Sequence, residues 1–166
     1  QGGPVFSLRE GSVTDIVRQV VSEQRLIREG VDIECQIDEA SERWAQADME
    51  PRYIHRAVQN LVGNAARYAA GRVRVSCHLD EDNCRIDVED DGPGIPEQDW
   101  EKVFTAFARL DDSRTRTSGG YGLGLSIVRR ILYWHGGQAF VGRSDVLGGA
   151  RFSLVWPRLK PADPDL

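Results

Sequence analysis

Apolar side chains recur along the chain at two spacings, and these spacings predict its secondary structure. A repeat of three to four residues predicts helices over about 12–29, 49–70 and 121–135. Asp48 is expected to cap the second helix and Gly71 to end it. Alternation predicts strands over about 31–37, 43–47, 72–79, 84–89, 138–142 and 150–156. A short helix is expected over about 97–103. These elements favour an α+β fold, a two-layer sandwich in which helices cover one face of a mixed sheet.

Composition places the chain among ordinary globular domains. With 166 residues, 40% of them hydrophobic and 28% charged, it has the size of one domain with a core of its own. The net charge of −5 argues against a nucleic-acid partner, which would need clustered Lys and Arg. Three cysteines are too few for a disulfide framework and indicate a reducing, cytosolic setting. No apolar run is long enough to span a bilayer, and Gln1 in first place suggests a piece of a longer protein.

Two asparagines mark the first candidate site. Asn60 and Asn64 lie four residues apart on a predicted helix, and with Arg67 they fall within about 60° of one another around its axis. The carbonyl oxygens of two such amides can bind a hard cation such as Mg²⁺. A plain polar boundary beside the apolar stripe would give the same pattern, so the pair alone leaves both interpretations open.

Two glycine-containing segments mark further candidate sites. Asp90-Asp-Gly-Pro-Gly-Ile-Pro96 follows a predicted strand, and its glycines allow close backbone approach to a flat ligand. A carboxylate there could accept a hydrogen bond from an exocyclic amine such as that of adenine. A tight turn would explain the glycines but not the run of acids. Gly120-Tyr-Gly-Leu-Gly-Leu125 enters a helix, where free N–H groups and the helix dipole suit phosphate.

The order of these segments, within about 65 residues, is more specific than any one of them. The chain resembles the ATP-binding catalytic domain of sensor histidine kinases, within the superfamily of gyrase, heat-shock-chaperone and mismatch-repair ATPases. Among sensor kinases it is similar to the RstB type. The resemblance covers about residues 5–157 and rests on four motifs. They are residues 55–68 for the N box, 90–96 for the G1 box, 104–111 for the F box and 120–125 for the G2 box.

The resemblance implies a Bergerat-type ATP-binding fold, with a mostly antiparallel sheet and about three helices on one face. It implies that residues 11–157 form the catalytic domain. Residues 1–10 would be the remnant of a connection to dimerisation helices, and residues 158–166 a tail. The implied cofactors are ATP and Mg²⁺.

Residue roles follow from the same motifs. By the resemblance, Asn64 would be the principal Mg²⁺ ligand and a catalytic residue, with Asn60 as a supporting ligand. Asp90 would accept a hydrogen bond from the adenine amine and so select ATP over GTP, because guanine presents an oxygen there. The other residues implied to contact the nucleotide are Arg67, Tyr68, Gly92, Gly94, Ile95, Gly120, Tyr121, Gly122, Leu123, Gly124 and Leu125.

Residues 105–120 would form a lid over the nucleotide. Arg109, Arg114 and Arg116 are its candidates for binding the terminal phosphates, and the resemblance makes Arg109 and Arg116 catalytic. Solvated surface arginines are the alternative, more so for Arg114 than for Arg109. Tyr121 stands where the family usually has a smaller or polar residue, which puts the shape of the G2 turn in question.

The family transfers phosphate to a histidine on a dimerisation helix, and none of the three histidines here fits that role. His55 lies about 140° around its helix from the asparagines, His78 is on the outward face of a hairpin, and His135 ends a helix. The implied partners are therefore a histidine-bearing dimerisation domain and, through the parent protein, a response-regulator receiver domain. We expect a monomeric cytoplasmic domain without membrane contact, in a parent protein of the bacterial inner membrane.

Two alternative functions stay open. A serine kinase of the anti-sigma-factor type, or another ATPase of the superfamily, would keep the fold and change the substrate, and the F box argues against both. A module that binds ATP without transferring phosphate would keep the same binding residues. The sequence does not distinguish such a module from a kinase.

Overall fold

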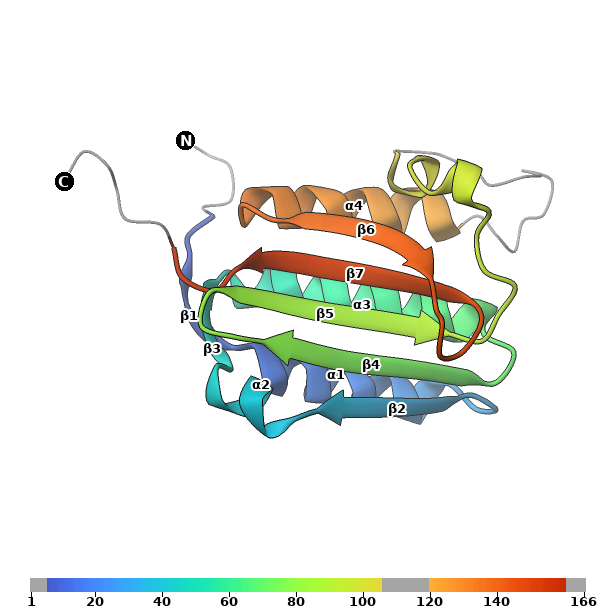
Figure 1. Cartoon of the computed structure of the whole chain (residues 1–166), viewed down its shortest axis with the longest axis horizontal. Coiled ribbons are helices and arrows are strands. Elements are labelled where there is room, and N and C mark those ends of the chain that lie inside the picture. Colours follow the sequence, from blue (N-terminus) through green and yellow to red (C-terminus); the bar gives the residue numbers. More distant parts are fainter. Residues whose placement is uncertain (1–5, 106–119, 161–166) are drawn as a thin grey trace.

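The computed structural model describes residues 6–105 and 120–160 as a twisted sheet with helices packed on one face (Figure 1). The strands are β1 (Arg9–Ser12), β2 (Asp32–Ile37), β3 (Gln46–Met49), β4 (Arg72–Leu79), β5 (Asn83–Asp90), β6 (Gln138–Arg143) and β7 (Ala150–Pro157). The helices are α1 (Val13–Ile27), α2 (Glu39–Arg43), α3 (Pro51–Tyr68) and α4 (Gly120–Trp134), with short 3₁₀ helices η1 (Glu97–Asp99) and η2 (Lys102–Phe104).

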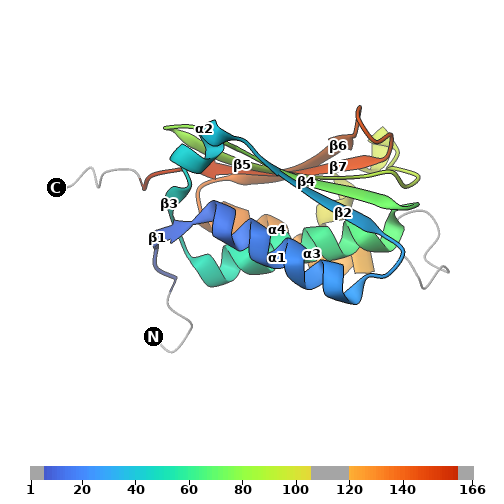
Figure 2. The ribbon, with the colours of Figure 1, turned by 90° about the horizontal axis from the view of Figure 1, so that it is seen from below.

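Five of the strands form one sheet in the order β2-β4-β5-β7-β6. β2 pairs with β4 in parallel, and the other neighbours in this sheet are antiparallel. β1 and β3 form a separate antiparallel pair. Figure 2 shows α1, α3 and α4 together on one side of the sheet. The prediction of an α+β sandwich, with a mixed, mostly antiparallel sheet covered on one face, is confirmed.

The strand predicted over 43–47 forms slightly later, as β3, so its predicted start is wrong. The residues before it form the short helix α2, which the spacing does not predict. Helix α2 is capped by Asp38, whose side chain accepts a hydrogen bond from the Ser41 N–H at 2.8 Å. The buried Ser41 hydroxyl accepts from the Leu79 N–H and donates to the Cys77 carbonyl, each at 3.0 Å. These contacts with β4, which is distant in sequence, stabilise a helix of little more than one turn. Apolar spacing alone does not predict it.

Strand β3 displaces the predicted start of the next helix. Asp48 is predicted to cap that helix, but it lies inside β3, so this prediction is also wrong. Pairing with β1 keeps the chain extended as far as Met49. Glu50 is the cap instead, and its side chain accepts a hydrogen bond from the Arg52 N–H at 3.2 Å. β1 begins at Arg9, inside the stretch expected to be a connecting remnant.

The core lies between the sheet and the three long helices. It consists of the apolar faces of α1, α3 and α4 and the alternating strand residues that point toward them. Cys77 and Cys84 belong to this core, and burial raises the pKa of each thiol to about 12. Both cysteines are therefore protonated packing residues. None of the described helices combines the length and the apolar character needed to cross a membrane.

Candidate functional site

A polar pocket of about 250 Å³ lies where α1, α3 and α4 meet. Its described lining residues are Gln24, Arg28, Gln59, Asn60, Gly63, Asn64, Arg67 and Gly124. The helical spacing predicts that Asn60, Asn64 and Arg67 share one face of their helix, and the structure brings all three to this pocket. Gly124 adds the first turns of α4 to the same cavity.

The two asparagines present amide groups to the pocket. The Asn60 amide nitrogen donates to the Gly124 carbonyl at 3.3 Å, which leaves its amide oxygen as an acceptor. Asn64 is only 9% exposed and makes no side-chain hydrogen bond within the described part of the chain. Its amide atoms are not fully enclosed, so they are open to the pocket, and a ligand there can supply the missing partner. An amide oxygen is among the ligands that Mg²⁺ accepts.

Asp90 ends β5 and is almost fully buried, with 3% of its surface exposed. Its Oδ1 accepts hydrogen bonds from the Gly92 N–H at 2.9 Å and the Ala150 N–H at 3.3 Å. Among the described residues no donor reaches Oδ2, so this oxygen can accept a hydrogen bond from a ligand. Burial, which these two donors only partly offset, raises the pKa of Asp90 above its usual value.

Two glycines allow the loop after β5 to approach its neighbours closely. A Cβ at Gly92 would lie 2.2 Å from the Tyr68 carbonyl oxygen, and one at Gly149 would lie 2.4 Å from Oδ1 of Asp90. Neither space admits a side chain, so the loop packs directly against the end of α3. Tyr68 lies about one helical turn beyond Asn64. The Asp90 loop and the asparagines therefore share the C-terminal end of α3.

Asp91, to which the motifs assign no role, connects the end of β5 with the turn after α3. Its Oδ1 accepts hydrogen bonds from the N–H groups of Ala70, Gly71 and Arg72, at 2.8, 3.0 and 3.0 Å. Burial acts to raise the pKa of Asp91, but these donors outweigh it and hold the pKa below its usual value. The carboxylate joins the turn after α3 to the end of β5. The run of acids is a sequence signal, yet it does not show that Asp91 joins two elements while Asp90 keeps one oxygen without a donor among the described residues.

The remaining predicted site residues lie in other parts of the chain than the asparagine pocket. Gly94 and Ile95 border a separate pocket of about 180 Å³. Asp90 is not among the described lining residues of either pocket. Leu125 is fully buried in the core. The predicted residues in the first turn of α4 are Gly120, Tyr121, Gly122 and Leu123. Those that lie outside the described residues are Arg109, Arg114 and Arg116.

Comparison with known proteins identifies the family of this chain. Residues 49–160 match the family described as histidine kinase-, DNA gyrase B- and HSP90-like ATPases. The chain belongs to this family. It is 45% identical over 111 residues to the sensor protein RstB of Escherichia coli K12, and the match covers 67% of this chain and 25% of RstB. The chain spans between 24% and 31% of the length of the curated relatives it matches.

Solved structures of histidine kinases share the fold of this ATPase domain. The mycobacterial sensor histidine kinase MprB matches with a TM-score of 0.75 and 26% identity, over 95% of this chain and 100% of that chain. Full-length ShkA in complex with AMPPNP matches with a TM-score of 0.77 and 26% identity, over 97% of this chain and 33% of that chain. The predicted resemblance to sensor histidine kinases is confirmed.

None of the three histidines of this ATPase domain lines the asparagine pocket. His135 uses both ring nitrogens, because Nδ1 donates to the Ile131 carbonyl at 2.7 Å and Nε2 accepts from the Glu50 N–H at 3.0 Å. Burial lowers the pKa of His135 and favours this neutral ring. His55 and His78 each lie beside a carboxylate, on α3 and on the outer face of the sheet.

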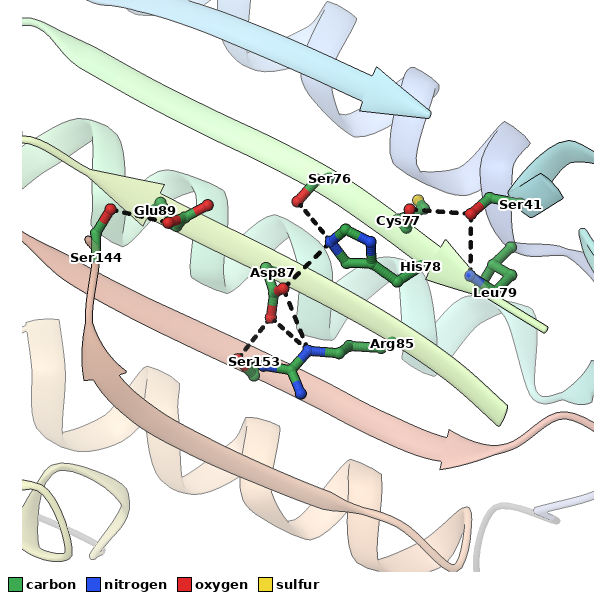
Figure 3. A network of polar contacts seen from close by, with 10 residues as sticks. All are labelled: Ser41, Ser76, Cys77, His78, Leu79, Arg85, Asp87, Glu89, Ser144 and Ser153. Atoms are coloured by element: carbon green, nitrogen blue, oxygen red, sulfur yellow. Dashed lines mark hydrogen bonds and ion pairs between the residues drawn. The ribbon is translucent and has the colours of Figure 1, made fainter. Parts of the chain in front are cut away.

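A second polar cluster lies on the sheet face opposite the helices (Figure 3). Asp87 accepts hydrogen bonds from the Ser153 hydroxyl at 2.6 Å and from Arg85 Nε at 3.0 Å, and its Oδ2 is 3.5 Å from His78 Nε2. Ser, His and Asp together suggest a hydrolytic triad, but Ser153 donates to the carboxylate rather than to the histidine. Ser76 and Asp87 moreover contact the same ring nitrogen of His78. The cluster therefore lacks an activated nucleophile.

Gln24 and Arg28 are pocket residues that sequence reasoning does not identify. Both lie near the C-terminal end of α1, outside all four family motifs. They flank the apolar stripe of that helix without any distinguishing pattern. Only the packing of α1 against α3 places them beside the asparagines.

Proposed function

We propose that this domain binds Mg-ATP and donates the γ-phosphate to a histidine on a separate dimerisation domain. One observation carries the proposal. At one end of α3, Asn64 is a nearly buried amide without a partner among the described residues, and Asp90 is a buried carboxylate with one oxygen free of donors there. The family supports it, because RstB is a sensor protein and ShkA was solved with AMPPNP, an ATP analogue.

Asp90 would recognise the adenine. Its Oδ2 would accept a hydrogen bond from the exocyclic amine, while Oδ1 stays bound to the N–H groups of Gly92 and Ala150. Guanine presents an oxygen at that position and would leave a buried carboxylate facing another acceptor. Such a mismatch costs about 1–3 kcal/mol. ATP should therefore bind about 5- to 150-fold more tightly than GTP.

Asn64 would bind the Mg²⁺ ion, with Asn60 beside it. The described lining of the pocket contains no Asp or Glu, so the oxygens that the pocket side chains offer a metal are those of amides. Bound Mg²⁺ would neutralise charge on the phosphate chain and hold it for transfer. The lid residues Arg109 and Arg116 are proposed to bind the transferred phosphate.

The acceptor histidine would come from a partner domain. His135 is engaged on both ring nitrogens, and neither His55 nor His78 lines the pocket. A dimerisation domain of the parent protein would supply the acceptor, and a response-regulator receiver domain would take the phosphate from it. The parent would be a sensor kinase of the bacterial inner membrane, with this domain on the cytoplasmic side.

Phosphate transfer between separate domains tests the proposed function. This domain is mixed with a histidine-bearing dimerisation domain and γ-labelled Mg-ATP, and the labelled residue is identified. We expect label on the histidine of the dimerisation domain, and none on this chain when it is incubated alone. Label on a serine would indicate a serine kinase, and binding of Mg-ATP without any transfer would indicate a binding module. Either result would contradict the proposal.

The variant Asn64→Ala tests the metal site. Loss of the amide oxygen should weaken Mg-ATP binding about tenfold and remove most of its Mg²⁺ dependence, measured by calorimetric titration with and without the ion. Asn83→Ala, which removes an exposed amide at the start of β5, is the matched control and should behave like the wild type. The same Mg²⁺ dependence in Asn64→Ala and in the wild type would rule out Asn64 as the metal ligand.

A further inference from the structure

Arg28 reaches the asparagine pocket from outside the four motifs. It is the C-cap residue of α1, where its backbone N–H donates to the Gln24 carbonyl at 2.9 Å. The residues on either side of it in sequence are exposed, whereas Arg28 is only partly exposed. Its guanidinium lies against α3, with Nη2 3.6 Å from the place that a Cβ on Gly63 would occupy. The side chain is therefore directed along α3 and lines the pocket.

Gln24 holds this guanidinium in place. Gln24 is 5% exposed, and its Oε1 accepts a hydrogen bond from Arg28 Nε at 3.3 Å. The bond engages one of the guanidinium donors and leaves those of the two terminal nitrogens for another acceptor. Within the described part of the chain, no carboxylate forms an ion pair with Arg28.

The pocket has an excess of positive charge. Its described lining contains two cations, Arg28 on α1 and Arg67 on α3, together with four side-chain amides and no Asp or Glu. Like charges that face one cavity repel each other, and a polyanion in the cavity removes that repulsion. Arginine binds phosphate oxygens in a two-pronged geometry. A phosphate chain therefore matches the charge and the donors of this pocket.

We propose that Arg28 binds the phosphate chain of the nucleotide from the α1 side of the pocket, and that Gln24 is the positioning residue that holds it there. The inference rests on the proposed function, since it concerns the same nucleotide. It gives α1 a part in nucleotide binding that the N, G1, F and G2 motifs do not describe.

A cation at the end of a helix also stabilises the helix dipole, so the test must separate binding from stability. Adenosine, Mg-ADP and Mg-ATP are titrated into the wild-type domain and the variant Arg28→Gln by calorimetry, at low and at moderate salt. Arg28→Gln should bind Mg-ATP about five- to tenfold more weakly, with a flatter salt dependence. Its adenosine affinity should be unchanged. Arg28→Lys, which keeps the charge but not the fork of donors, should recover part of the loss.

Matched controls complete the experiment. Arg56→Gln removes the same charge from an exposed position on α3 and should leave every affinity unchanged. Gln24→Ala should lower the affinity for Mg-ATP by less than Arg28→Gln does, because it releases the Arg28 side chain without removing it. The affinity for adenosine should again be unchanged. Thermal unfolding of each variant shows whether it is folded at the titration temperature.

Four outcomes would overturn the inference. Equal losses for adenosine and Mg-ATP in Arg28→Gln would indicate a general structural effect, and equal losses in Arg56→Gln would indicate an effect of net charge alone. Unchanged nucleotide affinity with slower transfer to the dimerisation domain would assign Arg28 to the partner interface. A wild-type domain that binds none of the nucleotides would overturn the proposed function as well, which distinguishes the two failures.

Discussion

The outer face of the sheet and the C-terminal end of α3 use similar polar side chains in opposite ways. On the sheet, Asp87 has partners at both oxygens, drawn from Ser153, Arg85 and His78 (Figure 3). At the end of α3, Asp90 receives donors at one oxygen only, and Asn64 receives none within the described residues. The two aspartates are 7% and 3% exposed, so burial does not separate them.

The two aspartates differ in the groups that balance their charge. Asp87 is balanced by a cation and a hydroxyl of the same chain, so its network holds neighbouring strands together. Asp90 is held by backbone N–H groups alone, and burial raises its pKa, which means that the folded chain carries an uncompensated cost when Asp90 is ionised. A group kept buried and incompletely paired is the pattern expected of a binding site. Substitutions in the two regions test this contrast.

The largest effect is expected at the sheet. Asp87→Ala should lower the free energy of unfolding by about 3 kcal/mol, because it leaves Arg85 and Ser153 without their acceptor. The affinity for Mg-ATP should not change, since the cluster lies on the face opposite the pocket. Urea denaturation and nucleotide titration of one preparation measure both quantities. Asp82→Ala, in the exposed turn before β5, is the control and should change neither.

If Asp87→Ala reduced nucleotide affinity while the domain remained folded, the two regions would be coupled and the contrast between them would fail. If it left the stability unchanged, the network would not be structural.

Asp90→Asn is expected to have an intermediate effect, and this effect should be on nucleotide affinity rather than on stability. The asparagine oxygen can replace Oδ1 and keep the bonds from Gly92 and Ala150, while its NH₂ group replaces Oδ2 and faces the adenine amine. ATP affinity should fall by at least about tenfold. Stability at pH 7 should be retained or increased, because the raised pKa of Asp90 indicates that its charge destabilises the fold. Calorimetric titration and thermal unfolding give the two results.

Asp90→Asn with wild-type affinity would remove Asp90 from the site. A variant that lost stability and affinity together would indicate that Asp90 belongs to the same structural class as Asp87.

The smallest effect concerns pH. Burial lowers the pKa of His135 from its ordinary value of 6.5, so the unfolded chain binds a proton at a higher pH than the folded domain does. The contribution of neutral His135 to the stability of the fold is therefore complete above pH 6.5, and it is lost as the pH falls from 6.5 toward the lowered pKa. We expect the unfolding temperature to fall as the pH drops below about 6.5, above the ordinary pKa values of Asp and Glu side chains.

His135→Gln should reduce this pH dependence, because it arises from the buried ring of His135, and His78→Gln is the control that should keep it. A dependence that disappears in His78→Gln would instead assign the effect to the outer face of the sheet.

Most of the fold follows from local patterns. The stripes of α1, α3 and α4 and the alternation in β2, β4, β5, β6 and β7 are short-range periodicities, so the long elements and the layer arrangement could be predicted. The shared face of Asn60, Asn64 and Arg67 follows from the same helical geometry. The wrong predictions occur between Asp38 and Glu50, where contacts of α2 with β4 and of β3 with β1 override weak local signals.

By its own spacing, the amino-acid sequence determined the three long helices, the strands of the five-stranded sheet and the motif residues offered to a nucleotide. Only the tertiary structure decided that Asp91 joins the turn after α3 to β5, that Asp90 keeps one oxygen free of donors from the described chain, and that Arg28 at the end of α1 joins the asparagines. The physical reason is distance along the chain. Periodicity reports the direction of a side chain relative to its own element, whereas a binding pocket depends on which unrelated elements pack together and which donors they leave unpaired.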